Sequence, residues 1–228
     1  MGISAGPSGV SDGLVFKLDA ANFRSYSGSG LTANGLVSGI GGTLVNGVGF
    51  TSSNNGSFIF DGTNDRINLP INASLDISES ITLESFIYPT AYKNIGGPGS
   101  FIISKPDSYY LELSPEGKIR VAFISLSSEI YYDGNITVSL NSWSHIAVTR
   151  DKNNSTINIY FNGILDRSLG SITGNIKVQQ VYAVMMGSFS GGDYQFFGRI
   201  ANAKIYNRAL SATEVMQNFN AMRERYNI

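Results

Sequence analysis

The sequence contains no cysteine, one histidine and one tryptophan among 228 residues. Without cysteine the chain forms neither disulfides nor thiolate metal sites, and it has no cysteine nucleophile. Only 14% of the residues are charged and the formal net charge is −1. Proteins that bind nucleic acid usually carry a surplus of basic residues on one face, so the composition argues against this class of partner.

Long apolar runs and targeting signals are also missing. No apolar stretch approaches the ~20 residues that a membrane-spanning helix needs, so we expect no membrane partner. The segment 1–9 has neither a cationic head nor an apolar core, so it does not match a secretory signal peptide. We therefore expect a protein made in the cytoplasm and not exported by the ordinary route.

What the sequence has instead is a series of short strand-like runs separated by turns. Glycine is abundant, with 26 residues, and hydrophobic residues make up 42% of the chain. The runs predict strands at 14–18, 56–60, 66–69, 80–88, 101–104, 109–113, 118–124, 129–132, 136–140, 142–150, 155–163, 164–169, 178–186 and 196–206. No strand alternates with a helix, so the pattern predicts antiparallel sheets and an all-β fold.

The clearest alternation lies in the region 142–163. Ile157, Ile159 and Phe161 share one face of a strand, and the residues between them are polar or aromatic. The following pair, Asn162 and Gly163, suits a tight hairpin turn, which requires positive φ angles. This stretch predicts a hairpin with one face on a core.

One helix is predicted, at about residues 212–224. Ser211 and Glu214 have the Ser-x-x-Glu spacing of a capping box. Val215, Phe219 and Met222 then follow at helical spacing and form one apolar stripe. Because the chain shows no linker or repeat, we expect a flexible arm over residues 1–12 and one domain over residues 13–228 that includes the helix.

Six segments, taken together and in order, resemble a known family. They are Gly13–Asp19, Ser57–Asp65, Ile81–Pro89, Trp143–Arg150, Ile159–Gly163 and Gly198–Ser211. In these segments the chain resembles the laminin-G-like branch of the concanavalin A-like lectin/glucanase superfamily. The resemblance implies a two-sheet antiparallel jelly-roll sandwich.

The two ends resemble a narrower group. The segments 12–22 and 208–220 are similar to those of tailed-phage virion proteins that carry this domain on the capsid, neck or tail. This resemblance implies a virion location, other virion structural proteins as partners, assembly as a homo-oligomer, and adhesion to host surface glycans. We expect the assembly contacts at the N-terminal arm and the C-terminal helix.

Residues for glycoside hydrolysis are not apparent. A retaining glycosidase needs two carboxyl groups roughly 5 to 5.5 Å apart, which on a strand means acids two positions apart. Glu84 has no acidic neighbour on its strand, and Glu112 and Glu116 lie on either side of Pro115. His145 has no evident nucleophile partner, so we expect it to pack beside Trp143. We predict no catalytic residue and a non-enzymatic protein.

A calcium site is one candidate. The turn from Asp61 to Asp65 offers short oxygen ligands, which suit a hard cation. It resembles the pentraxin segment that supplies an Asp–Asn ligand pair, here Asn64 and Asp65. Pentraxins add a Glu/Gln/Asp cluster from a later loop, and the equivalent stretch here, 186–193, keeps only Asp193. The alternative is a turn in which these side chains bond their own backbone. The sequence requires no cofactor, and calcium is its one candidate.

A sugar site is the other candidate, because a pyranose ring has an apolar face and polar edges. Aromatic residues beside polar ones at presumed loops or strand ends suit such a ligand. The residues that meet this description are Tyr92, Tyr131, Tyr132, Asp133, Asn135 and Tyr194. Each tyrosine also suits a half-buried strand position that binds nothing.

These observations predict a non-enzymatic virion surface protein of a tailed phage. Adhesion of this protein to host glycans is an additional role that they allow. The alternative is a calcium-assisted carbohydrate-binding lectin or adhesin module, which would lie outside the cell or on its surface. A polysaccharide hydrolase with an unfamiliar site is the third candidate.

Overall fold

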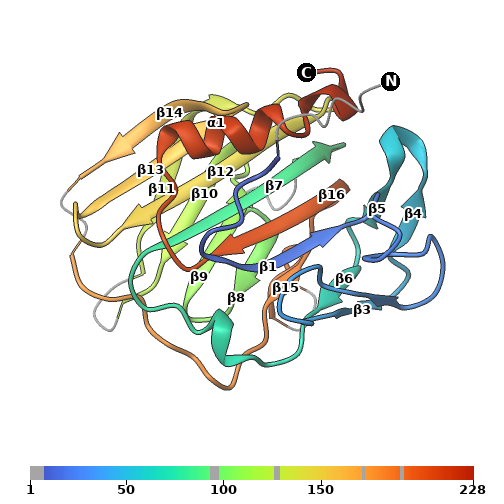
Figure 1. Ribbon diagram of the computed structural model, residues 1–228, viewed down its shortest axis with the longest axis horizontal. Coiled ribbons are helices and arrows are strands. Elements are labelled where there is room, and N and C mark those ends of the chain that lie inside the picture. The colour runs from blue at the N-terminus through green and yellow to red at the C-terminus, as the bar shows by residue number, and fades with distance from the viewer. Residues whose placement is uncertain (1–7, 93–97, 126–128, 171–172, 191–192) are drawn as a thin grey trace.

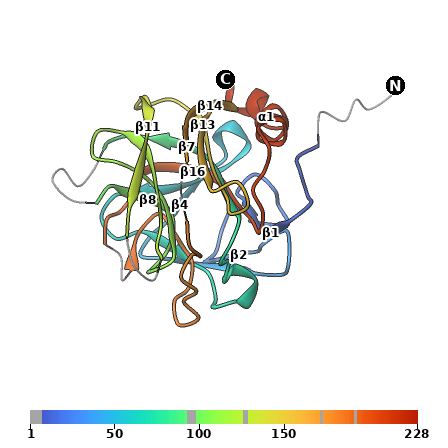
Figure 2. The ribbon, with the colours of Figure 1, turned by 90° about the vertical axis from the view of Figure 1, so that its left-hand side faces the viewer.

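The computed structural model describes residues 8–92, 98–125, 129–170, 173–190 and 193–228. Within these residues the strands form two eight-stranded antiparallel sheets that face each other, and one α-helix lies outside them (Figures 1 and 2). The predicted two-sheet jelly-roll sandwich with a short C-terminal helix is therefore confirmed. No helix in the described part of the chain is long and apolar enough to cross a membrane.

Sheet A has the strand order β14-β13-β12-β7-β16-β5-β4, and β1 pairs with the second half of β16. Its strands are β1 (Leu14–Asp19), β4 (Gly49–Thr51), β5 (Ser57–Asp61), β7 (Ile81–Pro89), β12 (Ser144–Asp151), β13 (Thr156–Phe161), β14 (Ile164–Leu169) and β16 (Phe197–Tyr206).

Sheet B has the strand order β11-β10-β9-β8-β15-β6-β3-β2. Its strands are β2 (Thr32–Ala33), β3 (Gly42–Val45), β6 (Arg66–Asn68), β8 (Ser100–Lys105), β9 (Tyr109–Leu113), β10 (Lys118–Phe123), β11 (Tyr131–Thr137) and β15 (Met185–Met186). Short 3₁₀ turns occur at Ser53–Asn55 (η1), Ala73–Leu75 (η2) and Arg223–Tyr226 (η4).

The main core lies between the two sheets and follows the alternation of the strands. On β7, Ile81, Leu83 and Ile87 point into it, and on β13 Ile157 and Ile159 do the same. Because side chains alternate between the faces of a strand, the intervening residues point away from the core. These outward residues form the outer faces of the two sheets.

The hairpin between β13 and β14 forms as the sequence predicts. Asn162 has φ 49° and Gly163 has φ 77°, which are the two positive angles that a type I′ turn needs. Gly163 lies directly against the C-terminal helix, because a Cβ atom placed on it would come within 3.0 Å of Phe219. The Asn162–Gly163 turn therefore closes the β13–β14 hairpin and also contacts the C-terminal helix.

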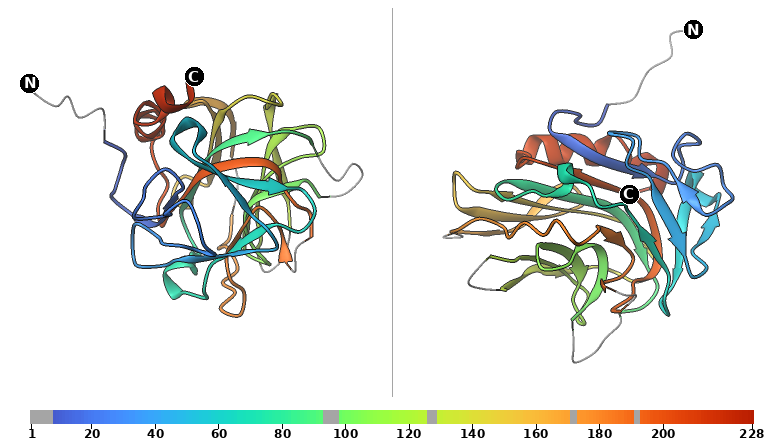
Figure 3. Two further views of the ribbon diagram at one scale, coloured as in Figure 1. Left: turned by 90° about the vertical axis from the view of Figure 1, so that its right-hand side faces the viewer. Right: turned by 90° about the horizontal axis from the view of Figure 1, so that it is seen from below.

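Helix α1 (Ala212–Asn220) covers the outer face of sheet A (Figure 3). Its N-terminus carries the predicted capping box, in which Ser211 and Glu214 accept hydrogen bonds from each other's backbone amides. Beneath it, Phe86 stacks on Phe219 and on Tyr226 of the segment after the helix. The outer face of sheet A thus carries a second buried layer, closed by the C-terminal part of the chain.

The segment 8–12, predicted as part of a flexible arm, lies against this same layer. The amide of Val10 donates to Oδ1 of Asn218 at 2.8 Å, and its carbonyl accepts from the Tyr206 hydroxyl at 3.0 Å. Asp12 forms an ion pair with Arg208 at 2.8 Å. Residues 1–7 of the predicted arm lie outside the described residues.

Two predicted strand regions differ from the observed ones. The runs 129–132 and 136–140 are joined in the single strand β11, which contains a register shift opposite β10. The run 178–186 is a strand only at Met185–Met186. Val181 and Tyr182 are exposed in the segment before it.

Candidate functional site

The outer face of sheet B differs from that of sheet A, because α1 lies on sheet A alone (Figure 2). An aromatic cluster occupies the middle of the outer face of sheet B. The rings of Phe101 and Tyr110 lie 5.4 Å apart, and Phe189 is 5.0 Å from Phe101 and 5.4 Å from Tyr110. Tyr194 joins the cluster at 6.1 Å from Phe101 and is partly exposed.

Next to the aromatic cluster lies a group of charged residues on β9, β10 and β11. Arg120 is opposite Glu112 on β9 and opposite Asp133 on β11. Arg120 donates two hydrogen bonds to Asp133, from Nε at 2.5 Å and from Nη2 at 3.0 Å. Its Nη1 is 3.7 Å from Oε1 of Glu112. The guanidinium is therefore held between two carboxyl groups.

Glu112 is fully buried although it belongs to the outer face. Burial raises the pKa of this carboxyl to about 7, and the opposing effect of Arg120 does not cancel it. Tyr110 lies two residues before it on the same face of β9, so the charged group and the aromatic cluster are continuous. The face therefore carries a carboxyl group whose charge changes near neutral pH.

Tyr131 is the exposed aromatic residue of this face. Its side chain is 38% exposed, its hydroxyl donates to Glu129 at 2.7 Å, and Arg120 lies 5.7 Å from the ring centre. Burial and the nearby Glu129 raise the pKa of Tyr131. An exposed ring beside a fixed ion pair can stack on an apolar surface and bind polar groups at its edge.

The predicted sugar-site residues fall into two groups. Tyr131, Asp133 and Tyr194 lie on the outer face of sheet B, as described above. Tyr132 points inward and packs against the main core. Asn135 binds Asp166 of β14 through its backbone and side-chain amides.

Tyr92 lies at the edge of sheet B, where its hydroxyl donates to the carbonyl of Val138. The structure thus brings three of the six predicted residues to one face and assigns structural contacts to the other three.

The predicted calcium residues do not gather into one cluster. Within the described residues no group of three or more His, Cys, Asp or Glu side chains is placed to hold a metal ion. Asp61 accepts from the amide of Thr63 at 2.7 Å, and Asp65 accepts from the amide of Asp61 at 2.9 Å. Asp193 instead forms a bridge with Phe189. These contacts describe a turn that bonds its own backbone, and calcium binding stays a prediction.

Oδ1 of Asp65 is the one feature of this turn that suits a cation. The carboxyl group is buried and this oxygen has no hydrogen-bond partner among the described atoms. Burial raises the pKa of Asp65. Asp61, Thr63 and Asn64 are exposed at the same turn and also carry side-chain oxygens.

Glu84 and His145 belong to a different place, the layer beneath α1. Glu84 is fully buried, with Nζ of Lys204 at 2.6 Å and the ring nitrogen Nε2 of His145 at 3.4 Å from Oε1. His145 packs against Phe86 at 4.7 Å between ring centres, on the side where Trp143 also lies. The prediction that His145 packs as a strand residue near Trp143 agrees with these contacts.

The comparison with known families decides the classification. Residues 61–216 match a laminin G domain family that is described as the Concanavalin A-like lectin/glucanases superfamily. The chain belongs to this superfamily. Strands β1 to β4 and residues 57–60 of β5 lie before the matched range and complete sheets A and B.

Solved structures of the same fold come from bacterial proteins. Domain 4 of the extracellular arabinanase AbnA from Geobacillus stearothermophilus, solved in complex with arabinotriose, is 18% identical with a TM-score of 0.68, over 90% of this chain and 97% of that one. The binding domain of Paraclostridial Mosquitocidal Protein 1 is 21% identical with a TM-score of 0.72, over 92% of this chain. The chain spans 52% of that toxin domain.

A third structure is the carbohydrate-binding module CBM40 of the Ruminococcus gnavus IT-sialidase, bound to alpha2,3 sialyllactose. It is 18% identical with a TM-score of 0.54, over 63% of this chain and 84% of that one. At these identities the likeness establishes the fold. No curated protein matches the chain.

Proposed function

We propose that this protein is a glycan-binding module of the superfamily, and that it binds through the outer face of sheet B. The observation that carries the proposal is the exposed ring of Tyr131 beside the Arg120–Asp133 ion pair. A sugar ring offers an apolar face to an aromatic side chain and hydroxyl groups to charged ones. This face provides both at one place.

The charged group is suited to polar recognition because it is already ordered. Arg120 is fixed by Asp133 and lies near Glu112, so little side-chain freedom is lost when a ligand hydroxyl binds. Hydrogen bonds from sugar hydroxyls to an ionised group are roughly twice as strong as those between neutral groups. Phe189 and Tyr194, which are partly exposed and pack on the buried Phe101 of β8, extend the surface for further sugar units.

The similar structures support this proposal over the others. The arabinanase domain was solved with arabinotriose and the sialidase module with sialyllactose. None of the three structures described above is a virion protein. The carbohydrate-binding alternative of the sequence analysis is therefore better supported than its main prediction.

We propose binding without bond cleavage. Glu84 is enclosed beneath α1 and already paired with Lys204, so it does not face any ligand on sheet B. Glu112 and Asp133 do share the outer face, but Arg120 lies between them and binds Asp133 through two hydrogen bonds. Release of reducing sugar from a bound oligosaccharide, lost in Glu112→Gln, would contradict this part of the proposal.

A glycan array that includes arabino-oligosaccharides and sialylated lactose tests the proposal. We expect binding of at least one glycan, and a loss of about five- to thirtyfold in affinity for Tyr131→Ala, since stacking contacts of this kind contribute about 1–2 kcal/mol. Tyr182→Ala is the matched control, because Tyr182 is 39% exposed and belongs to no strand of sheet B. Equal losses in both variants, or no binding to any glycan, would refute the assignment.

Calcium dependence is tested in the same assay with a chelator. The turn at Asp61–Asp65 is the predicted ion site, so a chelator effect that disappears in Asp65→Asn would locate the ion there. A chelator effect that persists in this variant would place the ion elsewhere.

A place on a tailed-phage particle remains our finer prediction and rests on the resemblance of segments 12–22 and 208–220. These segments lie on the sheet A side of the fold, away from the proposed glycan face. Labelling of purified particles with an antibody against the protein checks the location, and unlabelled particles would refute it. Light scattering of the purified protein checks the predicted homo-oligomer.

A further inference from the structure

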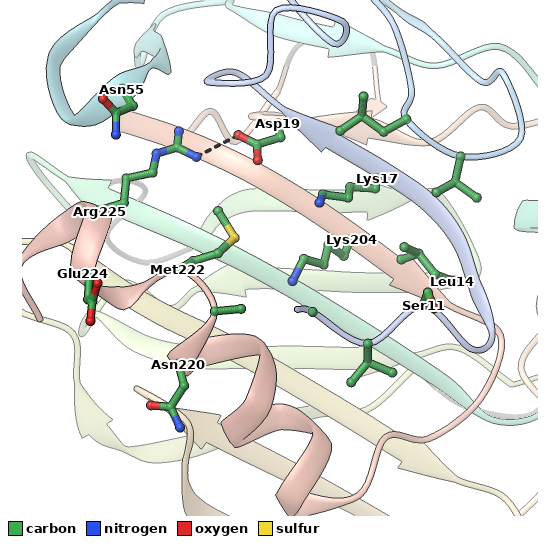
Figure 4. Close-up of a pocket in the computed structure, with 15 residues that line it drawn as sticks. Ser11, Leu14, Lys17, Asp19, Asn55, Lys204, Asn220, Met222, Glu224 and Arg225 are labelled. Atoms are coloured by element: carbon green, nitrogen blue, oxygen red, sulfur yellow. Dashed lines mark hydrogen bonds and ion pairs between the residues drawn. The ribbon is translucent and has the colours of Figure 1, made fainter. Parts of the chain in front are cut away.

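A cavity of about 1070 Å³ lies on the outer side of sheet A, between the N-terminal segment, β1 and the residues after α1 (Figure 4). Its walls include Val10, Leu14 and Met222, and its lining also contains Lys17, Lys204 and Arg225. The volume is slightly above the range of about 300–1,000 Å³ that is typical of small-molecule sites. The cavity is distinct from the proposed glycan face, which belongs to the other sheet.

Three cationic side chains meet at this cavity, and two of them already have partners. Arg225 pairs with Asp19 at 2.8 Å, and Lys204 pairs with the buried Glu84 at 2.6 Å. Lys17 forms no ion pair within 4 Å in the part of the chain that the structure describes. Its ammonium group therefore carries one positive charge that no contacting carboxylate balances.

The side chains are oriented so that this charge faces the cavity. Figure 4 shows the nitrogen ends of Lys17 and Lys204 directed the same way, toward the space beside Met222. Glu224 also lines the cavity but is exposed and lies at the opposite end from Lys17. Burial lowers the pKa of Lys17, and the nearby Lys204 lowers it further. An anion placed between the two ammonium groups would oppose both effects, because its negative charge favours the protonated form of each amine.

We propose that this cavity binds a small organic monocarboxylate through the ammonium group of Lys17. A monoanion matches the single unbalanced charge, whereas a dianion would leave one negative charge without a partner in a partly buried site. The apolar walls formed by Val10, Leu14 and Met222 suit a ligand with a carbon body attached to the carboxylate. The inference is independent of the glycan proposal.

Nuclear magnetic resonance titration of the full chain tests the proposal with butyrate and D-glucuronate as probes. Butyrate represents aliphatic acids, D-glucuronate represents acidic sugars, and D-glucose and inorganic sulfate are the neutral and dianionic controls. We expect saturable shifts of the Lys17 side-chain signal with at least one carboxylate, a rise in the pKa of Lys17 on binding, and at least tenfold weaker binding of both controls. Binding of butyrate but not D-glucuronate would identify the ligand as an aliphatic acid, and the reverse would identify it as an acidic sugar.

Two variants complete the test. Lys17→Met removes the charge but keeps much of the apolar stem, and it breaks no ion pair among the described residues, so we expect a folded protein with at least tenfold weaker carboxylate binding. Lys17→Arg keeps the charge and should retain binding. No shift with either probe in the unmodified protein, or equal affinity in Lys17→Met, would overturn the proposal. Tyr131→Ala should leave this binding unchanged.

Discussion

The carboxylate of Glu84 and the ammonium group of Lys204 lie 2.6 Å apart beneath α1, where both side chains are almost fully buried. The residues are separated by 120 positions in sequence and meet because β7 and β16 are neighbours in sheet A. Asn218 of α1 donates to the second oxygen of Glu84 at 2.7 Å. The pair therefore links the central strands of sheet A to the helix that covers them.

Glu84→Gln should lower the free energy of unfolding by about 3–5 kcal/mol, because it leaves the Lys204 charge buried and unpaired. Urea unfolding followed by circular dichroism measures the loss. Glu224→Gln is the control, since Glu224 is exposed. In the double variant Glu84→Gln with Lys204→Met, the loss should be smaller than the sum of the two single losses; a sum that is simply additive would mean that the pair is not coupled.

Glu112 should make stability fall as the pH rises toward neutrality. Burial raises the pKa of Glu112 from 4.5 to about 7 in the folded state, so the folded protein holds a proton that the unfolded chain has released. This contribution is fully present below pH 4.5 and is lost as the pH rises through about 7. Its removal in Glu112→Gln should flatten the change in stability between pH 5 and pH 8 by about 2–3 kcal/mol.

Urea unfolding at several pH values checks this expectation. Glu116→Gln serves as its control, because Glu116 lies close in the chain but its side chain is largely exposed and its pKa is lowered through its hydrogen bond with Ser114. An unchanged pH profile in Glu112→Gln would show that Glu112 titrates in its ordinary range.

Gly163→Ala should destabilise the protein by about 2 kcal/mol or more. The position has φ 77°, which costs an L-residue about 1–2 kcal/mol, and the new Cβ would lie 3.0 Å from the Phe219 side chain. Thermal unfolding measures the effect. Gly170→Ala is the comparison, because a Cβ there meets nothing within 4 Å, and a similar loss in both variants would show that the turn geometry is not responsible.

Tyr226→Ala should expose the single tryptophan. The Trp143 ring lies 4.6 Å from the Tyr226 ring, and its indole nitrogen donates to Asn54 at 3.2 Å. Loss of the tyrosine ring admits water, so the fluorescence emission should move to longer wavelength, with a stability loss of about 3 kcal/mol. Tyr182→Ala should leave the emission unchanged, and an unshifted spectrum in Tyr226→Ala would mean that other groups shield Trp143.

Local sequence patterns predicted the elements that depend on near neighbours. The alternation of Ile157 and Ile159 indicated the core face of β13, and the Asn162–Gly163 pair indicated its hairpin. The spacing of Ser211 and Glu214 indicated the start of α1. Each of these features depends on residues within a few positions, so periodicity and capping chemistry were sufficient.

The candidate site depends on contacts that such patterns do not contain. Arg120 meets Glu112 and Asp133 only because of the registers of β9, β10 and β11, and one of these registers is shifted. The sequence alternation does place Glu112 and Arg120 on one side of their strands, but it does not say which residues lie opposite each other. The aromatic cluster likewise joins Phe101 to Phe189, which is 88 positions later in the chain.

The hydrogen bond between Val10 and Asn218 has a consequence for how copies of this domain are connected. Both ends of the fold lie on the side of sheet A, so a tether attached at either end leaves the opposite face open. Several domains joined in this way would present their sheet B faces together to a repetitive surface. Weak individual contacts would then add up through high effective concentration, and the strength of attachment would depend on the spacing of the tethers rather than on any one site.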